Sequence, residues 1–220
     1  MAASFATMRD MDTHAITTDP HAVTSVEALE AIYGRPSELA ANKSTDRLDA
    51  VTLAFISASP FCLLGTQGRK GNHITPRGDA PGFVVALDDK HLMIPDRKGN
   101  NRLDGYRDII EDNRVSLLFL VPGMGETMRV HGTAVISADP ELRERCIAQE
   151  KVPSTVLIVE VREIFMQCAK AIMRSDLWDG RKKAPGVPTM GALLAAHKKN
   201  GLDSAAYDAA AEARLRANMY

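Results

Sequence analysis

A cluster of cationic and turn-forming residues separates a short apolar segment from a segment with helical periodicity. The stretch "IPDRKGNNRLDG" contains Arg97, Lys98 and Arg102. If a helix begins near Arg102, Asn100 or Asn101 can cap it, and its first turn presents free backbone N–H groups at the positive end of the helix dipole. This combination predicts a phosphate site; the alternative is a solvated basic turn that binds nothing.

A second arginine stands before a predicted strand, in "HITPRGDAPGFVVAL". Arg77 can hold a phosphate through two parallel hydrogen bonds, and Gly78 lets the backbone approach a flat ligand closely. In the alternative reading this is an ordinary turn, in which Asp79 and Gly82 are present for their geometry. The two Arg-bearing turns flank one predicted hairpin, 83–95, so we expect them to converge on one anion.

A third group follows the last predicted strand, in "CAKAIMRSDLWDGRKK". It comprises Lys170, Arg174, Ser175 and Trp178, the only tryptophan. A tryptophan beside cationic side chains can stack on a ring while the cations pair with the ring's polar edge. Alternatively, Trp178 fills one end of a barrel as an apolar plug.

Composition limits the classes of partner. The chain has 220 residues, 45% of them hydrophobic, which suits one domain with appendages. A formal net charge of -1 gives no global field that would recruit nucleic acid or an anionic membrane. Aromatic residues make up only 5%, too few for a nucleic-acid stacking platform. The longest apolar run, "VSLLFLV", is too short for a membrane-spanning helix.

Metal and hydrolase motifs are missing from the sequence. The six histidines and three cysteines show no metal-ligand spacing, and no nucleophile elbow or phosphate-binding loop is present. We therefore predict no metal site. The widely spaced Cys62, Cys146 and Cys168 are expected to be buried free thiols in a reducing compartment. With no signal-peptide pattern at the N-terminus, we expect a cytoplasmic protein.

Short apolar segments bounded by Gly, Pro and Asp predict strands at 61–67, 83–89, 91–95, 114–121, 126–137 and 154–168. Tight turns at 88–90 and 122–126 join them as antiparallel hairpins. Helical periodicity predicts helices at 101–113 and 139–150. It also predicts two helices ahead of the first strand, in "SVEALEAIYG" and "TDRLDAVTLAFISASP", and two in the tail.

The predicted fold is mostly β with flanking helices (α+β), an antiparallel barrel with N-terminal and C-terminal helical additions. Its expected parts are an arm with short helices at 1–44, the barrel domain at 45–178 and a helical extension at 179–220.

The stretches "TPRGDAPGFV", "IPDRKGNNRLDGYRDIIEDNRVSLLFLVPG", "ETMRVHGTAVIS" and "CAKAIMRSDLW" resemble the pyridoxamine 5'-phosphate oxidase-like family of FMN-binding split β-barrels. The resemblance covers roughly residues 45–178. It implies a homodimer with two FMN molecules in clefts between the subunits. The candidate FMN-binding residues are Arg77, Gly78, Asp79, Arg97, Asn101, Arg102, Lys170, Arg174, Ser175 and Trp178.

The sequence also departs from the vitamin B6 oxidases of that family. The segment "ADPELRERCIAQEKVPSTV" offers no Tyr, Arg and Ser set for a substrate phosphate, and the closing Arg-Leu-x-Pro segment is absent. The resemblance therefore implies a divergent member, an FMN-dependent oxidoreductase whose substrate and electron donor the sequence does not specify. The alternative is a protein that stores or senses flavin without turnover.

Overall fold

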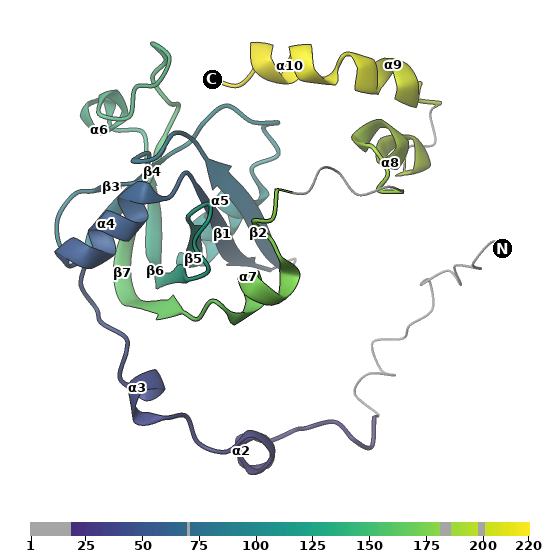
Figure 1. Ribbon diagram of the computed structural model, residues 1–220. Helices are drawn as coiled ribbons and strands as arrows, with labels where there is room; N and C mark the ends of the chain where they lie inside the picture. The colour runs from purple at the N-terminus through teal and green to yellow at the C-terminus, as the bar shows by residue number, and fades with distance from the viewer. Residues whose placement is uncertain (1–18, 70, 181–185, 198–200) are drawn as a thin grey trace. The chain divides into compact units, whose positions relative to one another are not determined.

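The computed structural model describes residues 19–69, 71–180, 186–197 and 201–220 (Figure 1). Residues 1–18 of the predicted N-terminal arm lie outside these ranges, as do residue 70 and residues 181–185 and 198–200, the last two within the predicted C-terminal extension. The chain divides into two compact units, Met1–Asn42 and Lys43–Tyr220.

Among the described residues of the first unit are two short helices, α2 (Val26–Tyr33) and α3 (Glu38–Ala41). Each begins after a serine whose hydroxyl accepts a backbone hydrogen bond: Ser25 Oγ from Ala28 N at 3.1 Å, and Ser37 Oγ from Ala40 N at 3.3 Å. No residue of α2 is buried. Capping by Ser25 therefore stabilises α2, whereas burial of the helix's own side chains does not.

The second unit is built on a seven-stranded antiparallel sheet with strand order β2-β1-β5-β6-β7-β4-β3. The strands are β1 (Phe61–Gly68), β2 (Gly71–Gly78), β3 (Val85–Ala86), β4 (His91–Pro95), β5 (Arg114–Leu120), β6 (Thr127–Ser137) and β7 (Val156–Gln167). The sheet curves into a barrel-like wall but its edges do not pair, so the predicted antiparallel split β-barrel is confirmed and the barrel is not closed by backbone hydrogen bonds.

The edge strand β2 was missed in the sequence, where its end was interpreted as a turn carrying Arg77. In the structure all eight residues of β2 pair with β1, and Arg77 lies opposite Cys62. The strand has no apolar alternation because its half-buried positions are His73, Thr75 and Arg77. An edge strand also tolerates Pro76, which reads as a strand breaker in sequence. By contrast, the strand predicted at 83–89 shrinks to the two residues of β3.

In the described part of the second unit, seven helices flank or follow the sheet. They are α4 (Ala50–Ala58), α5 (Asp104–Glu111), α6 (Pro140–Glu144), α7 (Lys170–Ser175), α8 (Met190–His197), α9 (Ser204–Ala209) and α10 (Ala211–Ala217). The helix predicted at 139–150 is thus much shorter, and the predicted last helix is interrupted at Ala210.

The apolar core lies inside the curved sheet. Alternate residues of β1, β5, β6 and β7 supply most of it: Leu64, Leu117, Phe119, Val130, Val159 and Ile164 are each at most 1% exposed. Helix α5 packs against β1 and buries Tyr106 and Ile109. Leu103 and Ile110 are exposed. Leu103 precedes the helix, and Ile110 lies about 100° around the helix axis from the buried Ile109.

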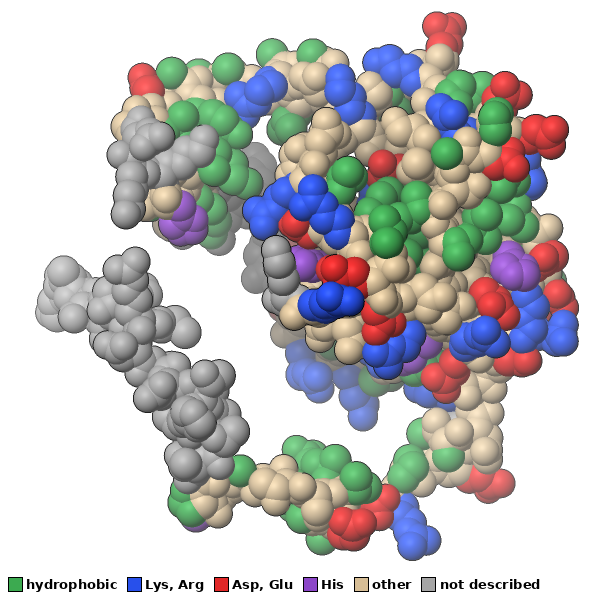
Figure 2. Space-filling view, turned by 180° about the vertical axis from the view of Figure 1, so that it is seen from behind, with side chains coloured by type: hydrophobic (Ala, Val, Ile, Leu, Met, Phe, Trp, Pro, Cys, Tyr) green, Lys and Arg blue, Asp and Glu red, His purple; other side chains and the backbone are tan. Residues whose placement is uncertain are grey.

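The surface carries no single-sign field in the view of Figure 2, where acidic and basic side chains are interspersed over the second unit. No helix among the described residues has both the length and the apolar character needed to cross a membrane. All three cysteines are free; Cys62 and Cys146 are buried as predicted, whereas Cys168 is exposed. Cys168 follows the end of β7, where the sheet gives way to α7.

Candidate functional site

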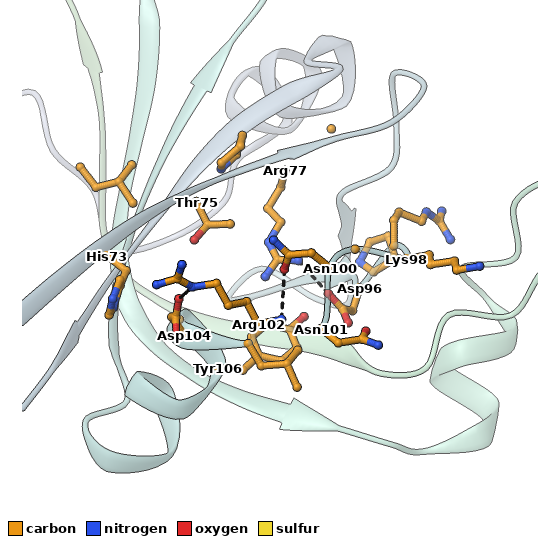
Figure 3. Close-up of a pocket in the computed structure, with 18 of the residues that line it drawn as sticks. His73, Thr75, Arg77, Asp96, Lys98, Asn100, Asn101, Arg102, Asp104 and Tyr106 are labelled. Carbon is orange, nitrogen blue, oxygen red and sulfur yellow. Dashed lines mark hydrogen bonds and ion pairs between the residues drawn. The ribbon is translucent and has the colours of Figure 1, made fainter. Parts of the chain in front are cut away.

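A cavity of about 610 Å³ lies between β2 and the loop that joins β4 to α5. Strand β2 contributes alternate side chains, His73, Thr75 and Arg77, and the loop contributes residues 96–103. Figure 3 shows Arg77 pointing from β2 toward the loop that carries Asp96, Asn100 and Asn101. The two Arg-bearing segments identified in the sequence therefore meet at one cavity.

Two ion pairs join the walls of this cavity across the split in the sheet. Arg77 Nη1 lies 2.7 Å from Asp96 Oδ1, and Arg97 Nε lies 2.5 Å from Asp79 Oδ2. Arg77 and Asp79 belong to β2 and the turn after it, whereas Asp96 and Arg97 directly follow β4. The guanidinium of Arg77 also lies over the Tyr106 ring, 5.0 Å from its centroid. These side chains connect strands that the backbone leaves unpaired.

The loop before α5 is not the capped helix start that the sequence predicts. Helix α5 begins at Asp104, and the residue in its N-cap position is Leu103, which has a left-handed φ of 57° and no capping side chain. Asn100 instead closes a turn, since its Oδ1 accepts a hydrogen bond from Arg102 N at 3.0 Å. Asparagine competes effectively for such local backbone donors, so the helix starts later.

Arg102 consequently stands in the loop at the cavity wall. Its Nε donates to Asp104 Oδ2 at 2.5 Å, and its side chain is 75% exposed. That hydrogen bond leaves the two terminal guanidinium nitrogens for other acceptors. Asn101 has a left-handed φ of 58°, which asparagine tolerates better than most residues. This loop therefore brings an amide and a guanidinium to the same wall.

Arg97 and Asp79, also predicted to bind the cofactor, hold each other in place. The Arg97 side chain is 17% exposed, and its Nη1 donates to Cys146 O at 2.7 Å. Asp79 Oδ1 accepts from Tyr220 Oη at 2.8 Å and from Ala80 N at 2.7 Å. Burial opposes ionisation of Asp79, but these hydrogen bonds and Arg97 outweigh it and lower the pKa of the carboxyl. The pair therefore fixes the loop beside the phosphate candidates.

A buried carboxylate supports the far end of the cavity. Asp108 Oδ2 accepts a hydrogen bond from Thr66 Oγ1 at 2.7 Å and lies 2.7 Å from Nδ1 of His73, which lines the cavity. The Asp108 side chain is only 8% exposed. Burial opposes its ionisation, yet the hydrogen bonds from Thr66 and His73 outweigh burial and lower its pKa. Asp108 thus links β1, β2 and α5.

The third predicted group is not brought to this cavity within one chain. Lys170, Arg174 and Ser175 belong to α7, and neither they nor Trp178 line the cavity. Trp178 Nε1 donates to Met124 O at 2.6 Å, in the turn between β5 and β6.

Several cavity residues were not identified from the sequence. They are His73, Thr75, Phe83, Asp96, Tyr106 and Met219. His73 and Thr75 could have been found by interpreting "HITPR" as a strand, because positions 73, 75 and 77 then share one face. Met219 carries no such signal, since it comes from the distant C-terminal segment.

No metal site is visible within the described ranges, where no group of three or more His, Cys, Asp or Glu side chains could hold an ion. The cavity is instead rich in hydrogen-bond donors, which suits an anionic organic ligand.

Comparison with known families and structures gives one family. The family model described as Pyridoxamine 5'-phosphate oxidase matches residues 48–168, more than half of the chain. Comparison with curated proteins gives no significant match.

Similar solved structures are 15–22% identical to this chain over the matched region, which covers 52–56% of it. HupZ of Group A Streptococcus is 18% identical, with a TM-score of 0.46, covering 55% of this chain and 94% of that one. A putative pyridoxamine 5'-phosphate oxidase of Lactobacillus delbrueckii is 22% identical, with a TM-score of 0.43, covering 56% and 98%. General Stress Protein 26 of Bacillus anthracis is 17% identical, with a TM-score of 0.40, covering 52% and 88%.

Replacing Asp108 by Asn tests its role as the cavity's support. Because its folded-state pKa is lowered, the charged carboxylate stabilises the fold above its ordinary pKa of 3.8, and this contribution is lost as the pH falls through the folded-state value. We expect D108N to lower the free energy of unfolding by about 1–3 kcal/mol at neutral pH. Urea denaturation at neutral pH and at about pH 3 measures the difference, which should shrink at the lower pH.

The exposed Asp46, whose side chain pairs with Lys90, provides the matched control. D46N should cost less than D108N at neutral pH, because exposed ion pairs contribute little. A D108N deficit that is the same at both pH values would show that the carboxylate charge is not what stabilises this region.

Proposed function

The chain belongs to the pyridoxamine 5'-phosphate oxidase family, and we propose that its first cavity binds FMN and that the protein is an FMN-dependent oxidoreductase. The observation that carries this proposal is the convergence of Arg77, Asn101 and Arg102 on one cavity inside the family-matched region. The flavin would supply hydride or electron transfer at its ring. The protein's part is to bind, orient and shield it.

The loop end of the cavity suits a phosphate. The terminal nitrogens of Arg102 and the side-chain amide of Asn101 offer several donors within a few residues of one another. Arg77 adds positive charge from the opposite wall, although Asp96 already accepts from its Nη1. An arginine fork matches phosphate oxygens better than an ammonium does. Gly99 faces open space, so the backbone there does not restrict access.

The remaining cavity lining suits a flat, partly apolar ring. Phe83, Pro95, Leu103 and Met219 contribute apolar surface, and Thr75 contributes a hydroxyl. A volume of about 610 Å³ falls within the ~300–1,000 Å³ of ordinary small-molecule sites. His73, whose Nδ1 lies 2.7 Å from Asp108 Oδ2, contributes its imidazole ring to the cavity wall.

We propose a homodimer in which α7 of one chain approaches the flavin of the other. The support is an apolar group exposed on one chain, Met124, Met173, Leu177 and Trp178, each at least 37% exposed. Two members of the group are in contact, since Trp178 Nε1 donates to Met124 O, and the turn that carries Met124 packs closely on Ala169, the residue before α7. An exposed apolar surface of this kind is typical of subunit contacts. In this arrangement Lys170 and Arg174 would come from the partner subunit.

Replacing two cations of the same loop separately tests the phosphate assignment. We expect R102A to weaken FMN binding by roughly 10- to 150-fold, the equivalent of charge-assisted hydrogen bonds. K98A should have a much smaller effect, because Lys98 Nζ already donates to Asn218 Oδ1 at 3.2 Å. Flavin fluorescence titration measures both. Equal losses would mean that loop charge matters and the position of Arg102 does not.

Rapid mixing separates an oxidoreductase from a protein that only binds flavin. We expect the flavin-loaded protein to lose its flavin absorbance on anaerobic mixing with NADH or NADPH, faster than free FMN at the same concentration, and to recover it in air. This follows because a bound ring is oriented and shielded from side reactions. If absorbance with both donors stays as stable as that of free FMN, the storage or sensing function is the better account.

A further inference from the structure

A second cavity, of about 470 Å³, lies beside the first. The two share one wall, formed by Asp96, Arg97, Lys98 and Asn101. The opposite wall of the second cavity comes from residues 151–154, which precede β7, and from Tyr220. A molecule in the second cavity would therefore lie next to the proposed FMN-phosphate loop without using Arg77 or Arg102.

The second cavity carries an excess of positive charge. Its charged lining residues are Arg97, Lys98, Lys151 and one acid, Asp96. Arg97 and Asp96 are each neutralised by the ion pairs across the split. For Lys98 and Lys151, the described part of the chain provides no Asp or Glu side chain as an ion-pair partner. Two ammonium groups thus face one cavity without a matching carboxylate side chain, which is a favourable setting for an oxyanion.

The C-terminal segment, residues 218–220, accepts hydrogen bonds from both lysines of this cavity. Lys98 Nζ donates to Asn218 Oδ1 at 3.2 Å, and Lys151 Nζ donates to the main-chain oxygen of Tyr220 at 2.9 Å. The Tyr220 ring lies 5.8 Å from the Arg97 guanidinium, and its hydroxyl donates to Asp79. Between them, Met219 lines the first cavity. The segment therefore spans both cavities.

We propose that the second cavity is a subsite for a phosphate or carboxylate group of the redox substrate, and that residues 218–220 compete with this group for Lys98 and Lys151. Assigning the anion to a redox substrate rests on the proposed function; the anion subsite itself does not. Hydrogen bonds to an ionised acceptor are roughly twice as strong as those to a neutral amide such as that of Asn218. An anion held by both lysines would displace the segment and withdraw Met219 from the first cavity.

If the segment and the anion compete, a variant that lacks one of the lysines and a variant that lacks the Tyr220 hydroxyl change the affinity for the anion in opposite directions. Removing a lysine removes a ligand of the anion. Removing the Tyr220 hydroxyl removes an anchor of the competing segment and leaves the lysines in place, because that hydroxyl contacts Asp79. A general electrostatic attraction would give no such opposition, since Y220F does not alter the charge of the folded protein at neutral pH.

The experiment is calorimetric titration of the purified full-length protein with pyrophosphate, and separately with citrate, at constant ionic strength. For at least one probe, K98Q and K151Q should each weaken binding by roughly tenfold or more, and Y220F should strengthen it by a few-fold, as expected for single charge-assisted hydrogen bonds. The stronger probe identifies phosphate or carboxylate as the preferred group. K90Q is the matched control, because Lys90 lies at the opposite end of β4 and pairs with Asp46.

The variant R102A distinguishes the two cavities, since Arg102 lines only the first. If R102A leaves binding of the probe unchanged and K151Q abolishes it, the probe binds in the second cavity. If instead R102A abolishes binding and K151Q leaves it unchanged, the inference is overturned. A Y220F variant that binds both probes no better than the wild type also overturns it. A protein that shows the predicted order but binds no FMN would contradict the proposed function and retain the subsite. If the protein binds FMN but the variants do not show the predicted effects on probe binding, only the proposed subsite is contradicted.

Discussion

The ion pair between Arg77 and Asp96 joins parts of the sheet that no backbone hydrogen bond connects. Strand β2 is one edge of the sheet, and Asp96 follows β4, next to the other edge. Both side chains are less than one-fifth exposed, so their attraction is screened less than that of a surface pair. With Tyr106 beneath the guanidinium, this contact fixes the distance between the two walls of the first cavity.

Because the sheet is split at this point, polar and charged side chains of β2 and of the loop after β4 line a cavity there. A closed barrel would use β2 for a second backbone ladder; here the half-buried face of β2 presents His73, Thr75 and Arg77 to a cavity instead. The loop after β4 supplies cations on both of its sides, with Arg102 toward the first cavity and Lys98 toward both. The proposed FMN phosphate and the proposed anion of the second cavity would thus be held by neighbouring residues of one loop.

Much of this arrangement was predictable from sequence, and the errors have physical causes. Five strands are apolar segments bounded by turn-forming residues, and this local pattern predicts their positions. They are β1, β4, β5, β6 and β7. Strand β2 was missed because its cavity-facing positions are polar, which removes the alternation that reveals a strand. The start of α5 was misplaced because Asn100 binds the backbone of Arg102 locally instead of capping the helix.

The pairing of charges could not be predicted at all. Arg77, Arg97 and Arg102, which the sequence singles out, line one cavity in the structure, but the carboxylates that pair with Arg77 and Arg97 are set only by the fold. Arg97 is held by Asp79, whereas Arg102 keeps its terminal nitrogens toward the cavity. The contribution of residues 218–220 depends on contacts between residues 69 to 141 positions apart, which no local pattern encodes.

The central claim is that the cavity closed by Arg77 and Asp96 binds FMN. The visible absorption spectrum of the purified protein, after incubation with FMN and removal of the unbound ligand, tests it most directly. We predict the absorption bands of oxidised flavin at close to one flavin per chain, and release of authentic FMN on denaturation. A colourless protein after this treatment, or one that retains a different chromophore and excludes FMN, would contradict it.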